Sequence, residues 1–300
     1  MSATATTTSH TTNGQKRGKA RFLVIDGYHK AGRDELVAGG ASAAGDLYVR
    51  MLQKCLPGAE CDVVHPADPG ASLPKGAALE QYDGIAWTGC SLTIYDDDPR
   101  VGPQIELAKA AFDSKVPSFG SCWAAQMAIV AAGGIVRANP RGREMGIARK
   151  IGLTPEGRGH PLYFGKTSVF DAFISHVDEI THLPAGAVLL ASNAFTHIQA
   201  VAVTHKGGQF WGLQYHPEYN LHELARLTYC RIAKLVSLGF FKDADAAKRY
   251  VDMLEVLHQD PSRKDIAWLL GIDDDVMNED VRVAEVRNWI DRLVLPAMRH

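Results

Sequence analysis

The stretch VPSFGSCWAAQMAIVAAGG, residues 116–134, predicts a strand that runs directly into a helix. Residues 116–122 have the apolar and small side chains of a buried strand, and small residues fill the helix expected over 123–132. Gly133 and Gly134 should end that helix, because glycine is common just past a helix C-terminus. The stretch therefore predicts a strand–helix unit with Cys122 at the corner.

Short apolar runs alternate with amphipathic segments around this unit, which is typical of a parallel sheet covered by helices. Further strands of this sheet are expected at residues 21–28, 61–66 and 82–90, and further helices at 45–56 and 104–112. The continuous apolar runs indicate strands that are buried on both faces. We therefore predict an α/β fold with a mostly parallel central sheet.

The middle third of the chain has short strands joined by turns rich in Gly, Pro and Asn, which predicts a more antiparallel edge. These strands are expected at 135–137, 146–153, 188–192, 198–205 and 209–215. After residue 220 the apolar spacing becomes helical, with helices expected at 221–238, 246–258 and 281–294.

Three segments follow from this pattern. Residues 1–19 are rich in Thr and Ser and lack the apolar block of a secretion signal, so we expect a flexible tail. Residues 20–240 form the α/β domain. Residues 241–300 form a helical C-terminal extension.

The composition excludes several classes of function. A formal net charge of −2 gives no electrostatic reason to expect nucleic acid or an anionic membrane as partner. No apolar stretch approaches the roughly 18 residues of a membrane span. The five cysteines include no CxxC pair, so neither a disulfide framework nor a zinc site is indicated, and we expect no metal. Free cysteines fit a reducing compartment, so we expect the protein to be cytoplasmic.

The corner of the strand–helix unit resembles the turn that carries a nucleophile in a Gly-x-nucleophile-x-Gly pattern. Here the pattern is Gly120, Ser121, Cys122, Trp123 and Ala124, with a small residue in the last position. A thiol at a helix N-terminus is favoured as thiolate, which attacks carbonyl groups. Two alternatives remain, because a lone cysteine is often a buried apolar residue and Ser121 competes as nucleophile.

The segment GLQYHPEY, residues 212–219, supplies a candidate base. Pro217 disfavours the helical conformation for His216, so the chain stays extended, and the two-residue spacing can direct His216 and Glu218 to the same side. Such a pair suits a general base with the carboxylate that orients it.

The segment WTGCSLTIYDDDP, residues 87–99, ends a buried strand in a glycine turn. Backbone N–H groups around Gly89 and Cys90 could therefore form half of an oxyanion hole. The N–H of Trp123, just after the predicted nucleophile, would form the other half.

These motifs together resemble class I glutamine amidotransferases. The resemblance rests on Gly-x-Cys-x-x-x-Gln, on the glycine turn followed by Tyr-Asp-Asp, on SH-x-D at residues 175–178 and on Gln-Tyr-His-Pro-Glu, and it covers residues 21–238. It implies a flavodoxin-like three-layer fold in which Cys122, His216 and Glu218 are the catalytic triad. It also implies that Gln126 and the segment Ser175, His176 and Val177 hold the glutamyl part of a substrate.

The sequence departs from the family pattern at Cys90, Ala124 and Val177, all expected to line the pocket, which puts unsubstituted glutamine in doubt as substrate. The resemblance implies hydrolysis of a γ-glutamyl amide, glutamine or an N-substituted amide, through a γ-glutamyl thioester and without a cofactor. Two alternatives remain open: a glutaminase subunit that supplies ammonia to a separate synthetase, and a non-catalytic binding module. A homo-oligomer is also compatible with the helical extension.

Overall fold

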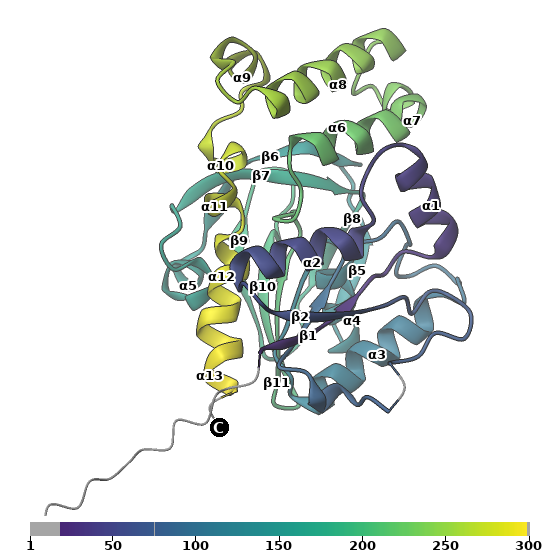
Figure 1. Cartoon of the computed structure of the whole chain (residues 1–300), viewed down its shortest axis with the longest axis vertical. Helices are drawn as coiled ribbons and strands as arrows, with labels where there is room; N and C mark the ends of the chain where they lie inside the picture. The colour runs from purple at the N-terminus through teal and green to yellow at the C-terminus, as the bar shows by residue number, and fades with distance from the viewer. Residues whose placement is uncertain (1–18, 75, 299–300) are drawn as a thin grey trace, which may run out of the picture.

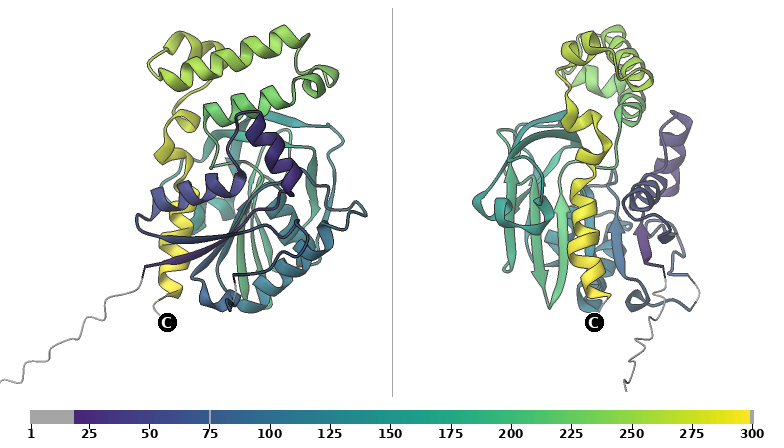
Figure 2. Two further views of the ribbon diagram at one scale, coloured as in Figure 1. Left: turned by 45° about the vertical axis from the view of Figure 1, so that its right-hand side comes forward. Right: turned by 60° about the vertical axis from the view of Figure 1, so that its left-hand side comes forward.

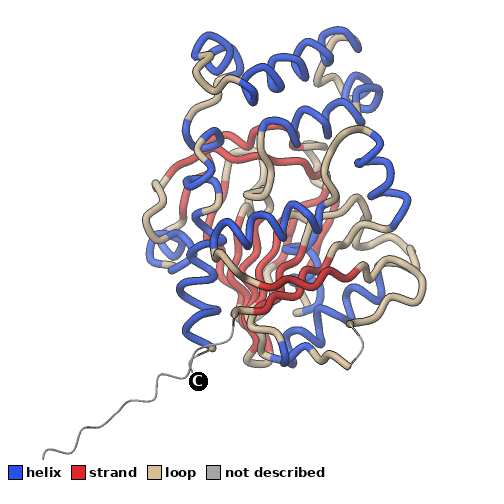
Figure 3. Tube along the Cα trace, in the orientation of Figure 1, coloured by secondary structure: helices blue, strands red, loops and turns tan. Residues whose placement is uncertain are grey.

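The computed structural model describes residues 19–74 and 76–298. Nine strands in this part of the chain form one sheet in the order β2-β1-β3-β4-β11-β10-β9-β6-β7 (Figures 1 and 3). The parallel half consists of β1 (Arg21–Ile25), β2 (Glu60–Val64), β3 (Gly84–Trp87), β4 (Ser118–Ser121) and β11 (Gly208–Leu213). The antiparallel half consists of β10 (Ala200–His205), β9 (Ala187–Ser192), β6 (Glu144–Leu153) and β7 (Val169–His176).

A second, two-stranded sheet pairs β5 (Ile135–Ala138) with β8 (Asp178–His182). The helices of the first half of the chain are α1 (Lys30–Ala38), α2 (Ala44–Cys55), α3 (Val101–Ser114), α4 (Trp123–Ala131) and the short α5 (Pro155–Gly159). Those of the second half are α6 (Leu221–Cys230), α7 (Ile232–Ser237), α8 (Ala244–Gln259), α9 (Lys264–Leu270), α10 (Asp274–Met277), α11 (Glu279–Arg282), α12 (Ala284–Trp289), a π-helical turn (Ile290–Val294) and α13 (Leu295–Ala297).

Helices cover both faces of the parallel half, as Figure 2 shows. Successive side chains of a strand point to opposite faces. In β1, Phe22 and Val24 pack in one core cluster with residues of α2 and α12, whereas Leu23 and Ile25 pack in another with residues of α3 and α4. The predicted α/β fold with helices around a largely parallel sheet is confirmed, and the expected antiparallel edge is present.

The structure differs from the sequence-based expectations in several places. The strands β7 and β8 and the helices α1, α5, α9, α10 and α13 were not predicted. The helix expected over 281–294 is interrupted at Val283, between α11 and α12. The helix expected over 221–238 is interrupted, because α6 ends at Cys230 and α7 begins at Ile232, with Arg231 between them. The predicted tail lies outside the described residues apart from Lys19. Within the described ranges, no helix combines the length and apolar character required to cross a membrane.

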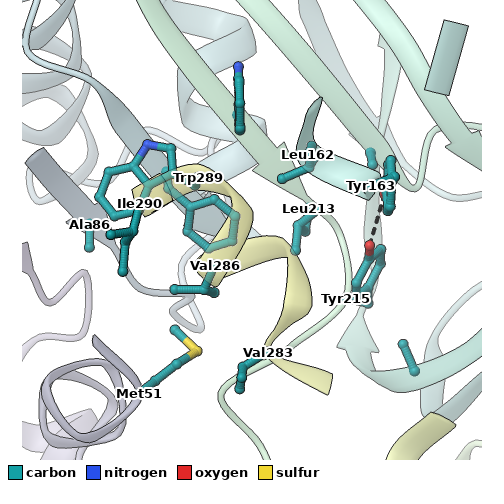
Figure 4. Packing of buried hydrophobic residues seen from close by; sticks show 14 of the residues in the cluster. Met51, Ala86, Leu162, Tyr163, Leu213, Tyr215, Val283, Val286, Trp289 and Ile290 are labelled. Atoms are coloured by element: carbon teal, nitrogen blue, oxygen red, sulfur yellow. Dashed lines mark hydrogen bonds between the residues drawn. The ribbon is translucent and has the colours of Figure 1, made fainter. Parts of the chain in front are cut away.

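The C-terminal segment returns to the main sheet and fills one of its faces (Figure 4). Trp289 is fully buried, and its ring centroid lies 5.6 Å from that of Phe22 and 5.6 Å from that of Phe119. A Cβ at Gly84 would lie 2.8 Å from the Trp289 ring, so the strand beneath this ring requires glycine. Residues 283–294 therefore belong to the same core as the strands.

A buried ion pair fixes the start of this segment. Lys166 Nζ lies 2.6 Å from Glu285 Oε1, and the hydroxyl of Tyr215 donates to the same oxygen at 2.7 Å. The hydroxyls of Tyr163 and Tyr215 are 2.8 Å apart. Breaking a buried pair by removing one partner leaves an uncompensated charge, so this contact strongly constrains the position of α12.

Replacement of Trp289 by Ala should lower the free energy of unfolding by about 3–5 kcal/mol, because it leaves a cavity between α12 and the sheet. Urea unfolding followed by circular dichroism measures the change. Trp268 on α9 is a matched control, since its side chain is 89% exposed and its replacement by Ala should change stability by less than about 0.5 kcal/mol. Equal effects of the two substitutions would contradict the packing described here.

Candidate active site

The corner between β4 and α4 has the geometry of a tight turn. Cys122 has φ 55° and ψ −111°, a backbone conformation that L-residues rarely adopt, and its N–H donates to the carbonyl of Leu213 at 2.7 Å. A Cβ at Gly120 would lie only 2.4 Å from the Cβ of Ala124. The two small residues that flank Cys122 therefore allow α4 to begin directly after β4.

Ala124 faces Gly120 and is fully buried, and it does not line the cavity beside Cys122. The expectation that it lines the pocket is wrong, because the close approach of α4 to β4 covers it. Cys90 and Val177 do line that cavity.

His216 reaches the same place from β11. β11 pairs in parallel with β4, with Leu213 opposite Ser121, and His216 follows shortly after the end of the strand. A Cβ at Gly89 would lie 3.1 Å from Cε1 of His216 and 3.3 Å from the Cβ of Cys122. The imidazole and the cysteine therefore converge on the glycine turn that follows β3.

Glu218 contacts the far side of the imidazole, with Oε1 2.6 Å from Nδ1 of His216. The same oxygen accepts a hydrogen bond from the hydroxyl of Ser121 at 3.1 Å, and Tyr48 donates to that hydroxyl at 2.6 Å. Ser121, which directly precedes Cys122, thus helps to hold the Glu218 carboxylate in place. Tyr219 stacks on His216 with 4.1 Å between ring centroids.

The electrostatic environment favours a charged imidazole. Burial lowers the pKa of His216, but the Glu218 carboxylate and the nearby Cys122 sulfur outweigh it and raise the pKa to about 10. Nε2 of His216, the ring nitrogen that does not contact Glu218, is buried and has no hydrogen-bond partner among the described residues. This is the arrangement expected of an imidazole that exchanges a proton at Nε2.

The residues predicted for an oxyanion hole lie around the sulfur. Gly89 faces both Cys122 and His216, and its carbonyl accepts the hydroxyl of Thr88 at 2.8 Å. The N–H of Cys90 belongs to the same trans peptide and therefore points away from Thr88. Trp123 is the first residue of α4, where N–H groups have no acceptor within the helix.

The predicted substrate-binding residues lie in one wall of the site. Cys122 Sγ is 3.8 Å from the carbonyl oxygen of Ser175. Both ring nitrogens of His176 are engaged, by the carbonyl of Asp178 at 2.8 Å and by Glu144 at 3.0 Å, so this side chain holds the turn between β7 and β8. The N–H of Asn139 fixes the carbonyl of Val177 at 3.0 Å.

Gln126, one turn into α4, has its amide nitrogen engaged. It donates to the carbonyl of Asp178 at 2.9 Å and to the side chain of Gln214 at 3.2 Å. Its amide oxygen has no partner among the described residues, and the side chain lines the cavity. Gln126 therefore ties down the β8 segment and leaves an acceptor for a ligand.

A cavity of about 610 Å³ opens beside Cys122 and His216. Its wall includes three cations that the sequence did not single out as site residues, Arg143, Arg231 and Lys234. Arg143 comes from a different segment of the chain from the other two. Within the described ranges, no group of three or more His, Cys, Asp or Glu side chains is placed to bind a metal ion.

Comparison with known proteins identifies related chains. The family model described as Glutamine amidotransferase class-I matches residues 44–228. A Gamma-glutamyl-L-1-hydroxyisopropylamide hydrolase of a Pseudomonas species is 35% identical over 94% of this chain and 95% of its own length. A glutamine-hydrolyzing GMP synthase of Thiobacillus denitrificans is 29% identical over 58% of this chain, which corresponds to 32% of that protein.

The fold has relatives among solved structures. A glutamine amidotransferase from Thermotoga maritima superposes with a TM-score of 0.65, covering 93% of this chain and 99% of its own, at 16% sequence identity. This similarity concerns the fold, and it confirms the flavodoxin-like architecture that the resemblance implied.

Replacement of Glu218 by Gln should lower the pKa of His216, because the effect of burial is then no longer outweighed by the carboxylate. NMR titration of the histidine side chains measures the shift. A pKa raised on folding contributes stability that is present below the unfolded value of about 6.5 and is lost as pH rises through the folded value. In the wild type that loss extends to about pH 10.

Glu255→Gln is a matched control, since this carboxylate contacts His222 and not His216. It should leave the titration of His216 unchanged. An unaltered His216 titration in Glu218→Gln would show that the contact does not set the protonation of the imidazole.

Proposed function

The chain belongs to the class-I glutamine amidotransferase family, and from this premise we propose that it hydrolyses γ-glutamyl amides to glutamate and an amine, with Cys122, His216 and Glu218 as catalytic residues. The observation that carries the proposal is the similarity, over nearly the whole chain, to a hydrolase of a γ-glutamyl amide. The convergence of Cys122 and His216 supports the assignment of the residues.

In the first half of the reaction, the Cys122 thiolate adds to the γ-carbonyl carbon of the substrate. The N–H groups of Trp123 and of Gly89 or Cys90 receive the developing oxyanion. His216, held as the imidazolium by Glu218, donates its Nε2 proton to the nitrogen of the departing amine. The carbon–nitrogen bond breaks, and a γ-glutamyl thioester remains on Cys122.

In the second half, His216 is neutral and accepts a proton from a water molecule, whose oxygen adds to the thioester carbonyl. The same N–H groups stabilise the second tetrahedral intermediate. Its collapse breaks the carbon–sulfur bond, releases glutamate and restores the thiolate–imidazolium pair. Every proton and bond is accounted for by the substrate, water and these side chains, so the reaction needs no cofactor.

Recognition of the glutamyl group is assigned to the wall formed by Gln126 and the Ser175–Val177 segment. The free amide oxygen of Gln126 is a suitable acceptor for a substrate ammonium group. Cys90 and Val177 add side chains to the cavity, which supports an N-substituted amide in place of glutamine.

A second candidate function is a glutaminase that delivers ammonia to a separate synthetase. The match to a GMP synthase supports it, although the chain spans about a third of that protein's length. Hydrolysis by the purified chain alone supports the first function. Activity that requires an added synthetase supports the second.

We also assign the reaction to the cytoplasm. All five cysteines are free thiols, and a reducing compartment keeps thiols in this form.

Cys122→Ala should lower kcat/KM for γ-glutamyl amides by about 10³-fold or more, because the covalent step is lost. Glutamate release from glutamine and from a panel of N-alkyl γ-glutamyl amides measures it. Rapid-quench mass spectrometry of the wild type should detect a γ-glutamyl group on Cys122. Cys61→Ala, on the edge strand β2, is the control and should retain activity. Full activity in Cys122→Ala would disprove the assignment.

A further inference from the structure

Two guanidinium groups meet at one hydroxyl in the wall of the cavity. Arg143 Nη1 donates to the Ser175 hydroxyl at 3.3 Å, and Arg231 Nη1 donates to the same oxygen at 2.8 Å. Both arginines line the cavity beside Cys122. Two like charges held this close repel each other, so their arrangement requires a compensating interaction.

The carboxylates of Glu35 and Asp178 also line the cavity, but neither forms a direct ion pair with Arg143 or Arg231. Other arginines of the chain have such a partner, as Arg33 has Asp68 and Arg149 has Asp171, but neither Arg143 nor Arg231 forms an ion pair within the described ranges. Nε of Arg143 is buried and has no hydrogen-bond partner. Burial and the neighbouring Arg231 lower the pKa of Arg143, and the Cys122 sulfur and the Asp178 carboxylate only partly oppose them.

The Ser175 hydroxyl completes the arrangement. An oxygen of this type accepts two hydrogen bonds and donates one, and both arginines use its acceptor capacity. Its own hydrogen has no acceptor among the described residues. The carbonyl of the same residue lies 3.8 Å from Cys122 Sγ. The unused donors of Arg143, Arg231 and Ser175 are therefore available close to the predicted nucleophile.

Arg231 lies just beyond the residues that the family model matches. That match ends at residue 228, and Arg231 occupies the break between α6 and α7. Arg143 immediately precedes β6, and the β6–β7 register, with Met145 opposite Ser175, brings it to the same hydroxyl. Two separate segments thus build one cationic position.

We infer that Arg143 and Arg231, with the Ser175 hydroxyl, bind a carboxylate of the substrate and make the enzyme selective for amides that carry one. This inference rests on the proposed function. Paired guanidinium groups match a carboxylate by bidentate hydrogen bonds. The carboxylate has two sources, the α-carboxylate of the γ-glutamyl group or a carboxylate on the leaving amine.

Three substrates separate these sources. γ-L-Glutamylmethylamide carries only the α-carboxylate, 4-amino-N-methylbutanamide lacks it, and γ-L-glutamylglycine carries a second carboxylate on the amine. Arg231→Gln should lower kcat/KM by about 10–100-fold for the substrates that present the recognised carboxylate and should leave the others nearly unchanged. Arg143→Gln should show the same pattern, and Arg231→Lys should lose less than Arg231→Gln because it keeps the charge.

A loss for both glutamyl substrates assigns the pair to the α-carboxylate, and a loss confined to γ-L-glutamylglycine assigns it to the amine. Arg158→Gln is the control, because Arg158 is exposed on α5, outside the cavity. Thermal unfolding of each variant separates a folding defect caused by the change at the half-buried Arg143 from a loss of binding. Equal losses for all three substrates, or no loss for any, would overturn the inference.

Failure of the proposed function has a different signature, since the wild type would then hydrolyse none of the three amides. Calorimetric titration with L-glutamate provides a readout that does not need turnover. Glutamate should bind to Cys122→Ala, and the further replacement of Arg231 by Gln should weaken that binding by about 10-fold or more. Unchanged glutamate affinity would contradict α-carboxylate recognition.

Discussion

The parallel pairing of β4 with β11 is the interaction on which the site depends. Its register sets Ser121 opposite Leu213, and the Leu213 carbonyl accepts the N–H of Cys122. The carboxyl ends of parallel strands emerge at the same edge of a sheet, so the cysteine and His216 meet although they are far apart in the chain. A slip of one residue would turn every side chain of β11 to the opposite face and separate the two groups.

The C-terminal helix α12 packs on the face of the sheet opposite to α4 and supports this edge from there. Glu285 accepts a hydrogen bond from Tyr215 and forms an ion pair with Lys166, and Tyr215 is the residue before His216. Because this ion pair is buried, a movement of α12 would separate Glu285 from Lys166 and leave a buried charge without its partner. The apolar spacing of residues 281–294 predicted a helical segment with one apolar face. Such spacing does not indicate which surface of the protein that face packs against.

The sequence predicted the parallel strands and the strand–helix corner because their apolar runs and small residues are local signals. It missed β7, which contains Asp171 and His176 within a buried run. Those polar residues are compensated by Arg149 and Glu144, partners that only the folded chain supplies. The predicted catalytic and oxyanion-hole residues are near one another for a local reason as well, since each follows the end of a strand or begins a helix.

The position formed by Arg143 and Arg231 could not be predicted from the sequence, because it depends on a helix break and on contacts between distant segments. The apolar spacing of residues 221–238 continues through Arg231, so the break between α6 and α7 is invisible in the sequence. In the same wall, His176 and the amide nitrogen of Gln126 form hydrogen bonds with other groups of the protein. These bonds hold the segment around Asp178 in place. Arg143 and Arg231 share one neutral hydroxyl instead. A half-buried cation that forms no direct ion pair is unfavourable, and an anionic ligand reduces that cost. We therefore place the selectivity of the site at these two unpaired arginines.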